Sequence, residues 1–136
     1  MDMLVNIDVP DLAQATAFYM QAFGLTVTRR FGASFVELSG LPARLYLLQK
    51  HAGSRGAGDD PRRYDRHWTP VHLDVVVDDI DAALRQALAA GAKAETPIAT
   101  HAWGKIATLS DPFGHGFCLI EFLGRGYDEI ADQEAP

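Results

Sequence analysis

One stretch of the chain alternates hydrophobic and polar positions and then runs into a helical pattern. Residues 70–80 read PVHLDVVVDDI, in which aliphatic residues alternate with a His and an Asp, the period-2 pattern of a strand with two different faces. The aliphatic face requires a covering helix, whereas His72 and Asp74 give the other face polar chemistry that a pure core face avoids. Asp79 stands where a helix N-cap belongs, and Gly91 ends the apolar helical pattern that follows.

The same order of patterns occurs at the start of the chain. Residues 4–12 read LVNIDVPDL, and a helical pattern runs from there to a glycine. Val9 matches Val77, and Asp11 matches Asp79. The chain is therefore a tandem repeat with a period of about seventy residues, and two similar half-domains are expected.

Each repeat continues with three more strand patterns, so each repeat reads βαβββ. The expected later strands are residues 25–31, 33–38 and 45–49 in the first repeat and 92–96, 105–109 and 117–123 in the second. We predict an α+β fold in which the two modules, residues 3–50 and 70–123, place their sheets side by side to form a cupped mixed sheet with helices on its outer face. Residues 1–123 would be one domain, with residues 51–69 as a linker inside it and residues 124–136 as a C-terminal tail.

Composition and charge exclude several classes of protein. A net charge of −6 argues against nucleic-acid binding, because an acidic surface repels phosphate. No apolar run is long enough to span a membrane, and the N-terminus does not resemble a signal peptide. The single cysteine, Cys118, excludes an intrachain disulfide and favours a reducing compartment. We expect a cytoplasmic protein with no nucleic-acid or membrane partner.

Several motifs together resemble the vicinal oxygen chelate superfamily, which includes glyoxalases, bleomycin-resistance proteins and extradiol dioxygenases. The motifs that carry the resemblance are VPDL (9–12), FY (18–19) and GL (24–25) in the first module, and His72, VDDI (77–80) and DPFGH (111–115) through Glu121 in the second. The resemblance implies the cupped fold, a homodimer, and a small, partly apolar molecule as ligand.

The resemblance also implies where a metal ion would bind. Members that use a metal take a His and a Glu from the first and last strands of each module, facing the cup. His72 and Glu121 match this pattern, whereas Leu4 and Gln49 stand at the corresponding positions of the first module. His72 and Glu121 are thus the expected metal ligands and catalytic residues, unless they form a merely structural hydrogen-bonded pair.

Two functions remain open, and with them the question of whether the protein is an enzyme. It could be a lyase or isomerase of the glyoxalase type, assisted by one divalent ion such as nickel, zinc, manganese or iron. The alternative, with no cofactor, is favoured on the metal question: a metal-free protein that binds or sequesters a small molecule, as resistance proteins do. A dioxygenase is the least favoured of the family's activities.

Alternation along the last strand places Glu121 on the cup face with two apolar neighbours, and Cys118 on the opposite face as a buried, inert thiol. The expected residues of a ligand site are Leu4, Asn6, Gln49, His101, Trp103, Phe117 and Leu119. His115, in a tight glycine turn, is expected to face solvent. The arginine-rich linker is either a solvated tether or a flap that carries an arginine to an anionic ligand.

Overall fold

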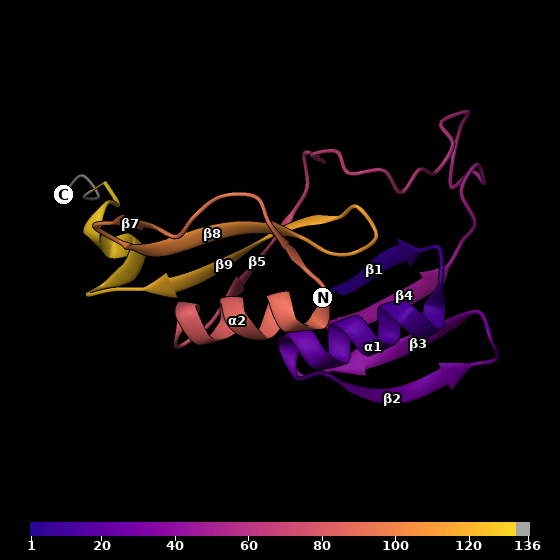
Figure 1. The fold of residues 1–136 in the computed structure, drawn as a ribbon, viewed down its shortest axis with the longest axis horizontal. Helices are drawn as coiled ribbons and strands as arrows, with labels where there is room; N and C mark the ends of the chain where they lie inside the picture. Colours follow the sequence, from indigo (N-terminus) through magenta and orange to yellow (C-terminus); the bar gives the residue numbers. More distant parts are fainter. Residues whose placement is uncertain (133–136) are drawn as a thin grey trace.

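The computed structural model describes residues 1–132 and consists of two modules, each with a sheet and one helix (Figure 1). The elements of the first module are β1 (Leu4–Val9), α1 (Leu12–Phe23), β2 (Thr26–Phe31), β3 (Phe35–Ser39) and β4 (Arg44–Gln49). Its strands lie in the order β1-β4-β3-β2, with β1 parallel to β4 and the other neighbours antiparallel.

The second module repeats this topology with one modification. Its elements are β5 (Leu73–Val76), α2 (Ile80–Ala90), β6 (Lys93–Ala94), β7 (Ala99–His101), β8 (Gly104–Ser110) and β9 (Gly116–Phe122). The order is β5-β9-β8-β6, and β7 pairs with β8 as well. The strand expected at residues 92–96 is only Lys93–Ala94, and β7, which was not predicted, follows Pro97, a residue that cannot donate to a β ladder.

The two helices begin and end at the residues that the sequence indicates. The Asp11 carboxylate accepts a hydrogen bond from the Gln14 amide at 3.0 Å, and Asp79 accepts one from the Ala82 amide at 3.1 Å. Gly24, at φ 67°, follows α1 in the left-handed conformation that glycine adopts without steric cost.

Each helix packs on one face of its own sheet, and α1 also contacts α2 where the two modules meet (Figure 1). The core shared by these layers includes Phe18, Leu47, Ile80, Leu109 and Leu119. Two βαβββ modules with a mixed sheet and a helix each confirm the predicted α+β fold.

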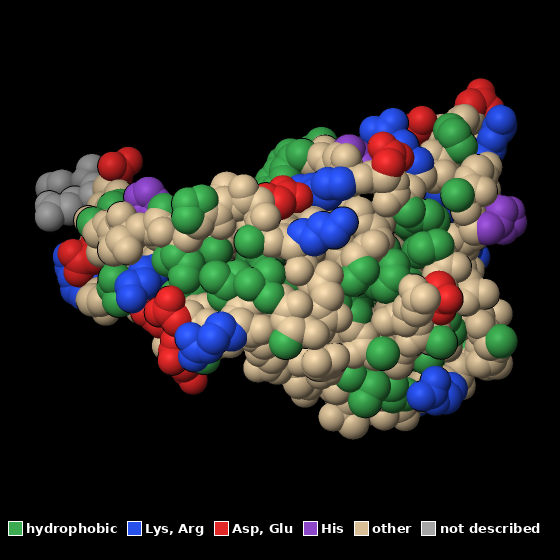
Figure 2. All heavy atoms as spheres, in the orientation of Figure 1, with side chains coloured by type: hydrophobic (Ala, Val, Ile, Leu, Met, Phe, Trp, Pro, Cys, Tyr) green, Lys and Arg blue, Asp and Glu red, His purple; other side chains and the backbone are tan. Residues whose placement is uncertain are grey.

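The surface is not uniformly polar. Figure 2 shows hydrophobic side chains reaching the surface between β9 and α2, with charged side chains of both signs around them. A short 3₁₀ helix (Gly126–Glu129) follows β9, and its Tyr127 ring packs against Phe122 at 4.8 Å. Of the tail expected at residues 124–136, positions 133–136 lie outside the described residues. Within residues 1–132, no helix has the length and apolarity that a membrane span requires.

Candidate functional site

The parallel pairing of β5 with β9 decides which side chains share a face. Asp74 lies opposite Cys118, and Val75 lies opposite Leu119. Because paired residues of neighbouring strands point to the same face, Cys118 joins Asp74 on the face away from the helices. Phe117, Leu119 and Glu121 alternate with Cys118 and point to the helix-covered side. The expectation that Glu121 faces the cup together with His72, and Cys118 the helix side, is wrong.

Glu121 and Gln49 occupy equivalent places and perform the same task in the two modules. The Glu121 Oε1 atom accepts a hydrogen bond from the Ile80 amide at 3.0 Å, and Gln49 Oε1 accepts one from the Leu12 amide at 2.9 Å. Ile80 and Leu12 are the first residues of α2 and α1, whose amides have no partner within the helix. Both side chains therefore complete a helix N-terminus, and the structure does not bring Glu121 and His72 together.

A cavity of about 320 Å³ lies between the first strands of the two modules. Its apolar walls come from β1, α1, β4, β5 and β9, and its lining residues are Val5, Asn6, Ile7, Asp8, Tyr19, Phe23, Leu41, Leu45, Thr69, Val71, His72, Leu73, Val75, His115, Gly116 and Phe117. Two of the residues expected to bind a ligand, Asn6 and Phe117, line it, as does His72, which was expected to be a metal ligand and catalytic residue. A mainly apolar cavity with a few polar groups is typical of a small-molecule site.

The remaining expected site residues lie elsewhere. Leu4 is 55% exposed at the start of β1, and Leu119 is buried in the core. His101 and Trp103 stack on each other, 5.4 Å apart, at the β7–β8 turn, where Trp103 also contacts Tyr127. None of these four residues lines the cavity.

His72, Asp74 and Cys118 form a cluster whose ligand atoms all lie within 4.8 Å of one another. The His72 Nε2 atom is 3.3 Å from Asp74 Oδ1, and the Thr108 hydroxyl is 3.4 Å from Cys118 Sγ. Burial raises the pKa of the Cys118 thiol, with a further contribution from Asp74. An imidazole, a carboxylate and a thiol are a ligand set suited to zinc or a similar borderline ion.

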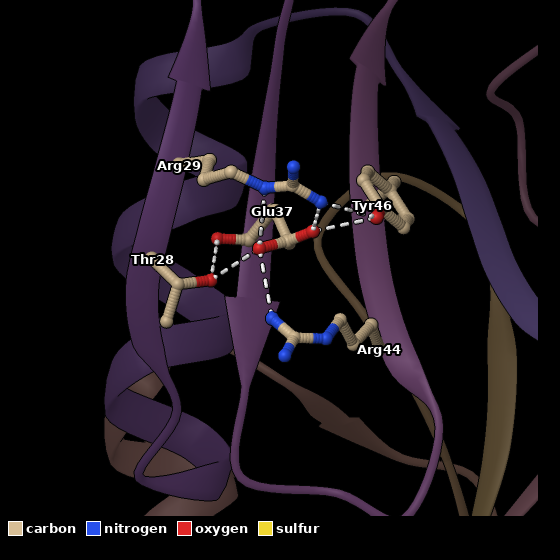
Figure 3. Close-up of polar contacts among 5 residues, drawn as sticks. All are labelled: Thr28, Arg29, Glu37, Arg44 and Tyr46. Atoms are coloured by element: carbon tan, nitrogen blue, oxygen red, sulfur yellow. Dashed lines mark hydrogen bonds and ion pairs between the residues drawn. The ribbon is translucent and has the colours of Figure 1, made fainter.

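A second polar cluster, on β2, β3 and β4, surrounds Glu37 (Figure 3). The fully buried Glu37 carboxylate accepts hydrogen bonds from Thr28, Tyr46, Arg29 and Arg44, with Arg29 Nη2 at 2.5 Å and Arg44 Nη1 at 3.0 Å. Hydrogen bonds from Arg29 and Tyr46 hold the pKa of Glu37 far below its ordinary value. Sequence reasoning missed this cluster, because nothing in the strand pattern shows that four donors meet one carboxylate.

A third cluster connects the two modules. Asp111, 2% exposed, accepts a hydrogen bond from the Tyr19 hydroxyl at 2.7 Å, and His115 Nδ1 lies 2.8 Å from the same carboxylate oxygen. The DPFGH turn and the FY pair are visible in the sequence, but their contact across 92 positions is not. His115 is not the simple exposed turn residue that was expected, because its ring is held by a buried carboxylate.

The linker is tied to the modules through its own arginines. Arg62 Nε is 2.6 Å from Asp8 Oδ2, Arg66 pairs with Glu95, and the Tyr64 hydroxyl donates to the Lys50 carbonyl at 2.6 Å. The Trp68 ring then lies against the His72 ring, tilted by 46° with the ring centroids 4.7 Å apart. The linker is therefore not a free tether, and two of its arginines pair with carboxylates of the modules.

Comparison with known proteins agrees with this architecture. The model of the glyoxalase-like domain family matches residues 4–120. An uncharacterized protein of Mycobacterium bovis is 29% identical over 119 residues, which cover 84% of this chain and 78% of that protein.

Solved structures share the fold at lower identity. A glyoxalase/bleomycin resistance protein/dioxygenase family enzyme from Burkholderia phytofirmans superposes with a TM-score of 0.73 at 23% identity, covering 90% of this chain and 100% of that one. A fosfomycin resistance protein from Listeria monocytogenes gives a TM-score of 0.71 at 15% identity, covering 95% and 96%. With the paired modules and the family match over most of its length, the chain belongs to the glyoxalase-like family of the vicinal oxygen chelate superfamily.

Proposed function

We propose that this protein binds a small, partly apolar molecule in the cavity between β1 and β5. The observation that carries this proposal is the cavity itself, about 320 Å³ in volume, with aliphatic and aromatic walls and a few polar groups from both modules. Burial of apolar ligand surface would supply most of the affinity, and the polar groups would orient the ligand.

Two valines on β5 provide a matched test of this site. Val75 lines the cavity, whereas Val76, its neighbour, is 58% exposed on the opposite face. Val75→Phe would fill part of the cavity and Val76→Phe would not. With indole as the probe in isothermal titration calorimetry, the parent protein and Val76→Phe should bind with the same affinity. Val75→Phe should bind at least tenfold more weakly, about 1.4 kcal/mol. Equal binding by both variants would contradict the assignment.

A second candidate function is metal-assisted lyase or isomerase chemistry, and the cluster of His72, Asp74 and Cys118 favours it. These residues would hold one divalent ion, which supplies a Lewis acid that polarises a substrate oxygen. Trp68, whose ring contacts His72 at a tilt, restricts the orientation of the imidazole ring. Glu121 has no part in this set because its carboxylate caps α2.

Cobalt(II) is a suitable probe for this set, because thiolate coordination to it produces a charge-transfer absorption band. The parent protein and Glu121→Gln should show the band, and Cys118→Ser should lose it while His72→Ala binds cobalt more weakly. A band that survives in Cys118→Ser, or that is absent in the folded parent protein, would exclude this metal site.

We also propose a homodimer and a cytoplasmic location. The edges of β1 and β5 have no strand partner within residues 1–132, and exposed apolar side chains lie on or beside these strands: Met3, Leu4, Val71, Leu73 and Val76, of which Val71 and Leu73 also line the cavity. Unpaired edges of this kind favour pairing with a second chain. A cytoplasmic location is supported by the single cysteine, which is buried and forms no disulfide.

A further inference from the structure

The hydrogen bonds of Asp111 fix both the position and the proton of the His115 ring. Asp111 Oδ1 accepts from the backbone amides of Phe113 and His115, at 2.8 and 2.9 Å. Asp111 Oδ2 accepts from the Tyr19 hydroxyl and faces His115 Nδ1 at 2.8 Å. Because a carboxylate oxygen facing the ring accepts hydrogen bonds, the tautomer that satisfies this contact carries its proton on Nδ1.

The second ring nitrogen of His115, Nε2, has no such partner in the part of the chain that the structure describes. Within residues 1–132, no group hydrogen-bonds to His115 Nε2. The side chain is 31% exposed and lines the cavity between β1 and β5, as does Tyr19. The His115 ring thus lies at the wall of an apolar cavity with Nδ1 engaged, while the carboxylate that orients the ring is buried.

We propose that His115 Nε2 is a proton-transfer site for the molecule bound in this cavity, with Asp111 and Tyr19 as positioning residues. The ligand class is a small, partly apolar acid whose C–H or O–H proton moves to Nε2 and returns to the product. The imidazole becomes a cation during the transfer, and the Asp111 carboxylate stabilises that cation across the Nδ1 hydrogen bond. This inference rests on the proposed function, because it needs a ligand in the same cavity.

The surroundings suit an imidazole base. The charged and titratable groups packed around the ring are Asp111 and Tyr19 beneath it, and Tyr64 and Arg66 from the linker beside it. The turn that carries the ring is fixed by the linker, since Gly114 lies against the Tyr64 carbonyl. A preorganised base costs no rearrangement at the moment of proton transfer.

The base-catalysed ring opening of 5-nitrobenzisoxazole tests the proposal without knowledge of the natural ligand. A base removes the C3 proton, its electron pair forms the C≡N bond, and the N–O bond breaks to leave a coloured phenolate. The parent protein should give saturable turnover above the buffer rate. His115→Asn retains an N–H donor toward Asp111 but has no base, so its kcat/KM should fall at least tenfold. His51→Asn, at an exposed linker position, should match the parent.

Three results separate the possibilities. If indole binds the parent protein in the cavity but the parent gives no turnover above buffer, the proton-transfer site is excluded and the binding site stands. If indole does not bind in the cavity, the proposed binding function is contradicted, and with it the proton-transfer site that depends on it. Turnover that survives in folded His115→Asn would also overturn the proposal. An independent readout on the parent protein is the ¹⁵N NMR spectrum of His115, where a proton on Nε2 rather than Nδ1 in the neutral ring would overturn it.

Discussion

At the scale of single residues, the role of a side chain depends on the strand face that it occupies and on the hydrogen-bond donors near it. Glu121 resembles a metal ligand in the sequence, yet its carboxylate satisfies the first amide of α2. Cys118, three residues earlier, lies on the face with His72 and Asp74. A shift of an odd number of positions along a strand moves a side chain to the other face.

Glu121 should therefore affect stability through its acceptor oxygen rather than its charge. Glu121→Ala removes the acceptor and should lower the free energy of unfolding by about 1 kcal/mol, the usual cost of losing a helix cap. Glu121→Gln retains an amide oxygen, as Gln49 does in the other module, and should unfold at nearly the parent urea concentration. If both variants lose stability equally, the charge matters and the capping role is wrong.

Glu37 should make stability depend on acid pH. Hydrogen bonds from Arg29 and Tyr46 lower the pKa of Glu37 in the folded state. The ionised carboxylate therefore contributes stability that is fully present above the unfolded pKa of about 4.3 and is lost as pH falls through the lower folded value. In urea titrations at different pH values, the parent should lose stability below about pH 5 more steeply than Glu37→Gln, which should already be less stable at pH 7. Parallel curves would contradict this role.

At the scale of elements, capping residues and apolar spacing were enough to predict both helices. Asp11 and Asp79 cap them as expected, and glycines end them. The faces of β9 could not be predicted in the same way, because Phe117, Cys118, Leu119 and Ile120 are all buried. A strand that is apolar on both faces does not alternate between hydrophobic and polar residues. Only the pairing register with β5 therefore shows which of its residues face the helices.

The β8–β9 turn should depend on the close approach of the linker. Gly114 has φ 94°, and a Cβ there would overlap the Tyr64 carbonyl oxygen. Gly53 has a similar φ of 86° with no heavy atom within 4 Å, so it serves as a matched control. Gly53→Ala should cost about 1 kcal/mol from backbone conformation alone. Gly114→Ala should cost clearly more, measured by chemical denaturation, and equal costs would mean that the linker does not press on this turn.

At the scale of the whole molecule, the two modules keep one topology and differ in chemistry. The register places Tyr46 of the first module where the second has Cys118, and Leu4 where the second has His72. The first module fills its open face with the Glu37 ion pairs, whereas the second has an imidazole, a carboxylate and a thiol there. The repeat could be predicted from the sequence, but the cavity could not, because its residues come from separate elements of both modules.

The free edges of β1 and β5 predict the assembly state. Light scattering after gel filtration should give twice the chain mass of 14.8 kDa. Val76→Lys, a change beside the β5 edge, should shift the protein toward monomer, whereas Leu88→Lys on α2 should not, although Leu88 is also 42% exposed. A monomeric parent protein would contradict this prediction.

The central claim is that a small molecule binds between β1 and β5, and an amide NMR titration with indole tests it most directly. The account predicts saturable shift changes that centre on Val5, Ile7, Val75 and Phe117, which line the cavity. These changes should vanish in Val75→Phe and persist in Val76→Phe. Changes that centre instead on Asp74 and Cys118, on the opposite face, or that grow linearly without saturating, would contradict it.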